Sequence, residues 1–166
     1  DAGDALAGKS TMDVLLVEDK DSLRTMLRHA LEGQGYTVIE ARDEPEARAA
    51  LGQSLPAVVL SDLRLPIGDG FGVLRAAKDA DPDLPVVVMT AWGSVEIAVE
   101  AMRRGARDFI QKPWDNARLL AIIRTQIELS QALRKGQRLE AENSLLRSEG
   151  FPKIVAESPA MQNVLQ

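Results

Sequence analysis

Several features are missing from the 166-residue sequence, and each absence excludes a class of protein. There is no cysteine, so disulfide bonds and thiolate metal sites are excluded, and this composition agrees with the reducing cytoplasm where we expect the protein to act. The apolar runs, of which residues 86–89 are typical, are far shorter than the roughly 20 residues that cross a membrane, so we expect no membrane partner. The net charge of −5 gives no general basic surface for nucleic acid.

What remains is an ordinary globular composition, with 45% hydrophobic and 27% charged residues. The length allows one well-packed domain and an appendage, because domains cluster near roughly 100–150 residues. Residues 1–11 are rich in glycine, alanine and aspartate, and they lack the basic start and apolar block of a signal peptide. We interpret them as a disordered leader.

Short β-branched runs alternate with longer amphipathic stretches, which is the pattern of βαβ units around a parallel sheet. The expected strands are residues 14–17, 37–40, 57–61, 86–90 and 109–110. Helices should cover both faces of the sheet, because the central runs are apolar on successive residues. They are expected to begin near Asp21, Glu44, Phe71, Ser94 and Asn116.

Polar side chains follow four of these runs, at the strand ends where such sheets bind ligands. Glu18 and Asp19 come after the first run and Asp62 after the third; Thr90 ends the fourth and Lys112 follows the fifth. Three clustered carboxylates are electrostatically costly, so a hard divalent cation with oxygen ligands is expected, by default Mg²⁺. Asp62 could then attack a phosphoryl group whose oxygens Lys112 neutralises and Thr90 hydrogen-bonds.

Each of these residues also has an ordinary structural interpretation. A single acidic residue after a strand is usually a helix N-cap or a turn former, and Asp21 or Ser22 is expected to cap the first helix. Lys112 could lie with its stem on the sheet edge, and Thr90 could merely end a strand. The coincidence of all the polar positions at strand ends favours the phosphoryl site.

One long helical pattern begins at Asn116 and meets no strong breaker before the Gly-Phe-Pro sequence at residues 150–152. It carries a seven-residue repeat, in which Asn143 resembles the polar residue that sets the register of dimeric coiled coils. We expect a parallel two-stranded coil; the alternative is a solvated connector helix, because several residues of the seam are small. The expected dimer contacts are Ile122, Leu129, Leu139, Asn143 and Leu146.

Residues 12–130 resemble the receiver domain of two-component response regulators. The motifs are Val-Glu-Asp at 17–19, Ser-Asp-Leu-Arg-Leu-Pro-Ile-Gly-Asp-Gly at 61–70, Val-Met-Thr-Ala at 88–91 and Gly-Ala-Arg-Asp-Phe-Ile-Gln-Lys-Pro at 105–113. The resemblance implies a flavodoxin-like five-stranded parallel sheet, with Asp62 accepting a phosphoryl group from a sensor histidine kinase. It also implies Mg²⁺ ligands from Asp19, Asp62 and the backbone carbonyl of Arg64, with Glu18 acting through a metal-bound water.

The same resemblance implies a switch, in which Thr90 swings toward the phosphoryl group and Phe109 rotates into the space it leaves. For Phe109 the alternative is an ordinary edge-strand aromatic. Ala91 is small where bulk would obstruct the phosphate. Pro113 is expected to follow a cis peptide bond that aims Lys112, since cis bonds are essentially confined to X-Pro.

A second, shorter resemblance lies in Ile-Val-Ala-Glu-Ser-Pro-Ala-Met-Gln at residues 154–162. It resembles the opening of the AAA+ ATPase domain of sigma-54-dependent transcriptional activators. We therefore expect a receiver at residues 12–130, a helical linker at 131–150 and the start of a truncated ATPase domain at 151–166. The sequence has no Gly-x-x-x-x-Gly-Lys-Ser/Thr loop, so no ATP hydrolysis is expected of this chain.

The two resemblances together imply a regulator rather than an enzyme acting on outside substrates. Phosphorylation of Asp62 is expected to change how a homodimer associates through its last receiver helices and linker coil. That change would regulate a downstream ATPase, whose contacts with ATP, sigma-54 RNA polymerase and DNA are expected outside this chain.

Three other functions remain open from the residues alone. A free-standing receiver that signals by docking to a partner would carry the same domain. An aspartate-nucleophile phosphatase uses a second aspartate two positions after the nucleophile, where this sequence has Arg64. A flavodoxin-like cofactor carrier needs a phosphate-binding Ser/Thr/Gly loop after the first strand, where Glu18 and Asp19 stand instead.

Overall fold

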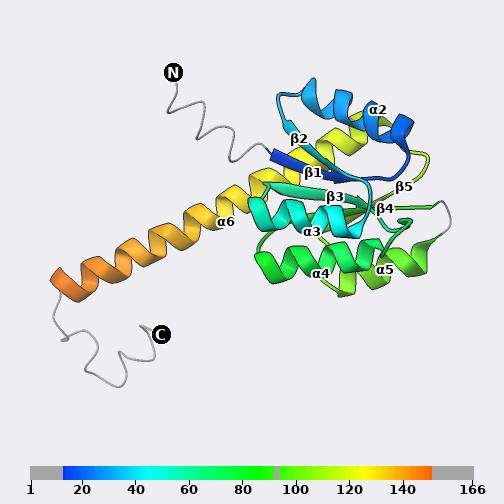
Figure 1. The fold of residues 1–166 in the computed structure, drawn as a ribbon. Coiled ribbons are helices and arrows are strands. Elements are labelled where there is room, and N and C mark those ends of the chain that lie inside the picture. Colours follow the sequence, from blue (N-terminus) through cyan, green and yellow to red (C-terminus); the bar gives the residue numbers. More distant parts are fainter. Residues whose placement is uncertain (1–12, 92–93, 151–166) are drawn as a thin grey trace. The chain divides into compact units, whose positions relative to one another are not determined.

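The computed structural model describes residues 13–91 and 94–150, without the side chains of Arg138 and residues 140–150 (Figure 1). The leader predicted at residues 1–11 and the ATPase segment predicted at 151–166 lie outside the described residues. The described residues fall into two compact units, which divide between Ser130 and Gln131.

The first unit is built on a five-stranded sheet in which all neighbouring strands run parallel, in the order β2-β1-β3-β4-β5. This topology confirms the predicted doubly covered, flavodoxin-like sheet. Parallel order brings the carboxyl ends of the strands to a single edge, and that edge carries the predicted site. The strands are β1 (Asp13–Val17), β2 (Thr37–Ala41), β3 (Val58–Asp62), β4 (Val86–Thr90) and β5 (Asp108–Gln111).

Helices cover both faces of the sheet, and alternate strand residues supply two separate apolar clusters (Figure 1). In β1, Leu15 and Val17 face one cluster, whereas Val14 and Leu16 face the other. The first cluster is closed by α3 (Glu44–Gln53), α4 (Gly70–Ala80) and α5 (Val95–Arg103), and the second by α2 (Asp21–Glu32) and the beginning of α6 (Asn116–Gly150). Each fully buried Leu, Ile or Val in these clusters stabilises the fold by about 1.5–3 kcal/mol.

The helices begin within one residue of the predicted positions, but the expected cap of the first helix is wrong. Lys20 occupies the N-cap position of α2, and no side chain accepts a hydrogen bond there. The Asp21 carboxylate instead pairs with Arg24 at 2.7 Å, because this arginine is held over the loop that follows β1. Asp43 and Asp69 do cap their helices, accepting hydrogen bonds from the amides of Glu46 and Gly72.

The long C-terminal helix predicted from the sequence is confirmed as α6. Its first turns bury Leu119, Ile123 and Ile127 in the cluster that also contains α2. The remainder of α6, from Gln131, belongs to the second unit. No helix among the described residues is both long and apolar enough to cross a membrane.

Candidate phosphoryl-acceptor site

Three carboxylates converge at the carboxyl edge of the sheet. Glu18 and Asp19 follow β1 and Asp62 ends β3, and each offers an oxygen within 4.8 Å of the oxygens offered by the others. Glu18 and Asp62 are buried, while Asp19 is more open to solvent. Such a cluster repels itself unless a cation balances it, because the interior screens charge less than water does.

Lys112, which follows β5, supplies one balancing charge. Its Nζ lies 2.6 Å from Oδ2 of Asp62 and 3.8 Å from Oε1 of Glu18. The other oxygen of Asp62, Oδ1, accepts a hydrogen bond of 2.9 Å from the backbone N–H of Arg64. Both oxygens of Asp62 are therefore held by positive or polar donors, which fixes the direction in which the carboxylate faces.

Glu18 is the most deeply buried member of the cluster. Burial raises its pKa to about 7, and the neighbouring Asp62 carboxylate adds to this effect, whereas the Lys20 amide and the Lys112 charge oppose it. Its Oε2 accepts the Lys20 amide at 3.0 Å, but its buried Oε1 has no hydrogen-bond partner. This unpartnered oxygen points to a cation or water as its missing partner.

Thr90 is 2% exposed at the end of β4, and its hydroxyl also lacks a hydrogen-bond partner. The hydroxyl is thus available to a ligand that arrives beside Asp62, since a buried donor gains most from a new acceptor. Asp62, Thr90 and Lys112 border a cleft of about 460 Å³. Its lining includes Asp19, Asp62, Arg64, Thr90, Ala91 and Lys112, with Leu63, Leu65, Pro66, Met89 and Ile97 as apolar walls.

Comparison with known proteins agrees with this geometry. Residues 14–124 match the response regulator receiver domain family. The chain belongs to this family. A receiver is a signalling module whose own chemistry is limited to its phosphorylation, so the acidic cleft is the expected position of its phosphorylated aspartate.

Relatives of this receiver include transcriptional regulators. The chain is 34% identical to the DNA-binding transcriptional regulator NtrC of Salmonella typhimurium, over 92% of this chain and 31% of that protein. It is 36% identical to the transcriptional regulatory protein ZraR of Escherichia coli, over 93% of this chain and 33% of that protein. Among solved structures, the receiver domain of NtrX from Brucella abortus matches with a TM-score of 0.67 and 36% identity, covering 70% of this chain and 98% of that one. The chain therefore spans about a third of the curated relatives it matches.

The donor set of this receiver fits a hard divalent cation. Carboxylate oxygens are what Mg²⁺ prefers, and the unpartnered Oε1 of Glu18 provides a buried acceptor that only a cation, a proton or water can satisfy. The Lys112 ammonium alone leaves the three carboxylates with a net negative charge. The cluster is typical of a receiver magnesium site.

Two residues of the predicted switch, Phe109 and Pro113, lie on β5 and on the loop that follows it. Phe109 is half-buried against the cluster closed by α3, α4 and α5. The Lys112–Pro113 peptide bond is cis, as expected. The motion of Phe109 remains a prediction.

The predicted dimer residues are spread along α6. Ile122 is half-buried against the receiver's own core, while Leu129 is 49% and Leu139 is 48% exposed. The side chains of Asn143 and Leu146 lie outside the described residues. Two of the five predicted contacts are thus exposed and available to another chain.

Arg24 is a site residue that the sequence did not reveal. Its Nη1 donates to the carbonyl oxygens of Glu18, at 2.9 Å, and of Asp19, at 3.5 Å. Its Nε pairs with Glu40 at 2.9 Å, so β2 and α2 together hold the acidic loop after β1. A basic residue near the start of an amphipathic surface helix carries no local signal for such a role.

Proposed function

We propose that this receiver accepts a phosphoryl group on Asp62 from a phosphohistidine of a sensor histidine kinase. The observation that supports the proposal most strongly is the pairing of Asp62 with Lys112 inside a cluster of carboxylates. An ion pair built only for stability would not need two further acidic groups beside it, since they weaken it by repulsion. A site that receives an anionic group together with a cation accounts for all four residues.

In the proposed reaction an oxygen of Asp62 forms a bond to phosphorus as the bond to the histidine nitrogen breaks, and the nitrogen keeps the electron pair. Lys112 balances the charge on the phosphoryl oxygens, and Thr90 donates its free hydroxyl to one of them. Ala91 lines the cleft and leaves room for the group. Asp19, Asp62 and the Arg64 carbonyl, with Glu18 acting through a water, would hold Mg²⁺, which would supply further neutralising charge beside the phosphoryl group.

The switch follows from the hydrogen bond that Thr90 gains. Its hydroxyl has no partner before phosphorylation, so movement toward a new acceptor costs no existing bond. We propose that Phe109 then packs into the vacated space. Because Phe109 is half-buried at the edge strand β5, its rotation would change the surface formed by α5 and β5.

The output we propose is a change of dimer arrangement in a cytoplasmic sigma-54-dependent activator. Relatives named as transcriptional regulators support this context, and so does the resemblance of residues 154–162 to the opening of an AAA+ domain, although that segment lies outside the described residues. The linker residues of α6, Leu129 and Leu139 among them, would carry the dimer contact. ATP, RNA polymerase and DNA would bind to regions outside this chain.

Acetyl phosphate with Mg²⁺ tests the phosphorylation. The intact mass should increase by one phosphoryl group, and Asp62→Asn should abolish the increase. An unmodified wild-type protein, or an equally modified variant, would contradict the assignment. A free-standing receiver would also gain one phosphoryl group in this experiment, but its sedimentation would not change upon phosphorylation.

A phosphatase is the weaker candidate. Arg64, which stands where such an enzyme needs its acid and base, is exposed and contributes its backbone N–H to Asp62. Multiple turnover of p-nitrophenyl phosphate that is lost in Asp62→Asn would favour the phosphatase.

A further inference from the structure

The side chain of Glu44, at the start of α3, lies against the loop that joins β3 to α4. Its Oε1 accepts a hydrogen bond of 3.1 Å from the backbone N–H of Asp69. Its own backbone N–H donates to the carbonyl oxygen of Ile67 at 3.2 Å. The side chain is only 18% exposed although it stands in the first turn of a surface helix. Glu44 is therefore bonded to the β3–α4 loop through both its side chain and its backbone.

Two glycines create the space that the Glu44 carboxylate occupies. A Cβ atom at Gly68 or at Gly72 would collide with the carboxylate of Glu44. Gly68 also has a φ of +75°, a conformation that strains any residue with a Cβ. The loop and the start of α4 thus fit around this particular side chain.

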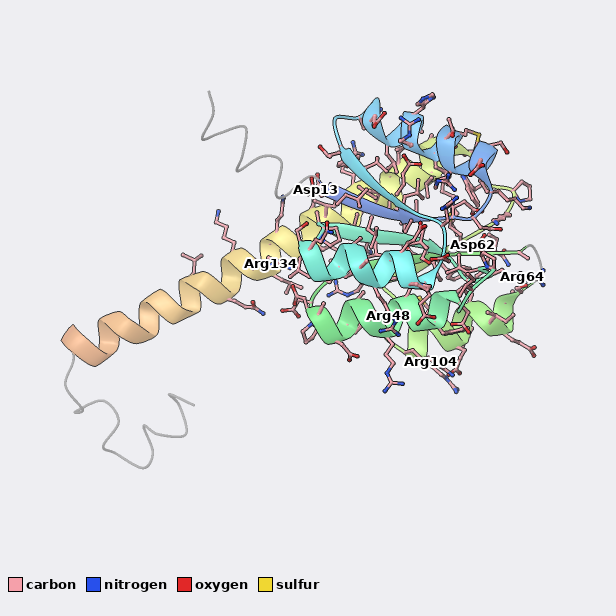
Figure 2. The ribbon with its side chains drawn as sticks, viewed as in Figure 1. Asp13, Arg48, Asp62, Arg64, Arg104 and Arg134 are labelled. Carbon is pink, nitrogen blue, oxygen red and sulfur yellow. The ribbon has the colours of Figure 1, made fainter. Side chains whose placement is uncertain are left out.

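Asp69 connects this contact to the phosphoryl site. It forms an antiparallel bridge with Arg64, so the loop is closed upon itself between these two residues. The backbone N–H of Arg64 in turn holds Oδ1 of Asp62 at 2.9 Å. Figure 2 shows Asp62 and Arg64 near each other at the same end of the sheet. The sequence of contacts from Glu44 to the acceptor aspartate passes through only Asp69 and Arg64.

Arg48, one turn further along α3, fixes the orientation of Glu44. Its Nε donates to Oε2 of Glu44 at 2.8 Å, and its Nη2 donates to the carbonyl oxygen of Gly72 at 3.4 Å. The bond from Arg48, together with that from the Asp69 amide, lowers the pKa of Glu44. The carboxylate stays charged at neutral pH, which strengthens its bond to the loop.

We propose that Glu44 and Arg48 form a positioning pair, which holds the β3–α4 loop in the conformation that presents Asp62 and the Arg64 backbone to the cation and the phosphoryl group. Glu44 touches neither ligand, and it acts through Asp69 and Arg64. The proposal rests on the proposed function, because it assigns the pair a role at that same site.

Glu46 offers a matched control in the same helical turn. Its carboxylate also accepts a backbone N–H, that of Arg42 at 2.8 Å, and pairs with the Arg42 side chain at 3.2 Å. Glu44→Ala and Glu46→Ala therefore each remove one ion pair and one backbone bond from the start of α3. Only the first variant removes a side-chain bond to the β3–α4 loop.

The experiment measures binding of Mg²⁺ with beryllofluoride, a phosphoryl mimic, by tryptophan fluorescence in both variants and in Glu44→Gln. We expect Glu44→Ala to weaken binding on the order of tenfold, as loss of support behind metal ligands does, with no change in Glu46→Ala. Glu44→Gln keeps the acceptor for Asp69 and should recover most of the affinity. Equal effects of the two alanine variants, or none in Glu44→Ala, would overturn the proposal.

Hydrogen exchange separates this outcome from failure of the proposed function. In the metal-free protein, the amide of Asp69 should lose protection in Glu44→Ala and keep it in Glu46→Ala; equal protection in the two would overturn the proposal. If the wild-type protein bound neither Mg²⁺ nor beryllofluoride, this result would contradict the proposed function and, with it, the positioning role. The exchange data would then show only whether Glu44 anchors the loop.

Discussion

Lys112 and Asp62 are joined by a contact of 2.6 Å across a strand that belongs to neither of them. Asp62 ends β3 and Lys112 follows β5, with β4 between the two in the sheet. The pair therefore spans the point at which Thr90 ends β4. A group that binds to Asp62 meets the lysine and the threonine together.

Replacing Lys112 tests its role as countercharge to the phosphoryl group. We expect Lys112→Met to weaken beryllofluoride binding roughly ten- to a hundredfold, because a hydrogen bond to a charged group contributes about 1.5–3 kcal/mol. Fluorescence titration measures the loss. Lys78→Met is the control, because Lys78 donates to the backbone carbonyls of Pro82 and Leu84 and does not line the cleft. Equal affinity of the Lys112 variant and the control for beryllofluoride would show that Lys112 does not act as the countercharge.

Removing the Thr90 hydroxyl should separate stability from signalling. Thr90→Val keeps the shape of the side chain and deletes a buried group that has no partner, so the metal-free protein should gain about 1 kcal/mol in free energy of unfolding. The change in sedimentation that beryllofluoride causes in the wild-type protein should be absent in Thr90→Val and present in Thr90→Ser. Urea unfolding and sedimentation measure the two effects. A Thr90→Val protein that responds like the wild type would refute the switch role.

The stability of the metal-free protein should depend on pH through Glu18. Its pKa is about 7 in the folded state and near 4.5 when unfolded, so the folded protein binds more protons between these values. In the presence of a chelator, the free energy of unfolding should fall as the pH rises from about 5 to about 8. Glu18→Gln cannot ionise and should flatten this part of the profile. A wild-type curve that rises over the same range would contradict the assignment.

The dimer contact can be tested on the exposed leucines of α6. The double substitution Leu129→Lys and Leu139→Lys should shift the monomer–dimer equilibrium toward monomer, because it places two charges on an apolar contact. Sedimentation measures the shift, and truncation before Gln131 should act in the same direction. Leu55→Lys is the control, since Leu55 is 42% exposed in the loop between α3 and β3. An unchanged monomer–dimer equilibrium in both altered proteins would refute the coil.

Much of the fold and the central site could be predicted because their signals are local. Apolar runs mark β1, β3 and β4, and parallel order then places Asp19, Asp62 and Lys112 at one edge regardless of their distance along the chain. No comparable rule locates a contact between a helix and a loop. The bond from Asp69 to Glu44 joins residues 25 positions apart, and it depends on two missing Cβ atoms rather than on any pattern.

The error at the start of α2 has a similar origin. Asp21 is a good capping residue by type, but Arg24 lies over the preceding loop and attracts its carboxylate. Arg24 is itself paired with Glu40 on β2, 16 positions away in the sequence, so a contact outside the helix influences this local feature. The seam of α6 shows the same effect, because Ile122 fits the seven-residue repeat and yet packs half-buried on the receiver core.

The separation of Asp62 and Lys112 along the chain also bears on the protein's synthesis. A growing chain that has reached only β4 would contain all three carboxylates and lack the ammonium that balances them. The acceptor site becomes complete only when β5 joins the edge of the sheet, as the last strand to be made. A chain synthesised only as far as β4 would therefore lack the countercharge that we propose for the phosphoryl group.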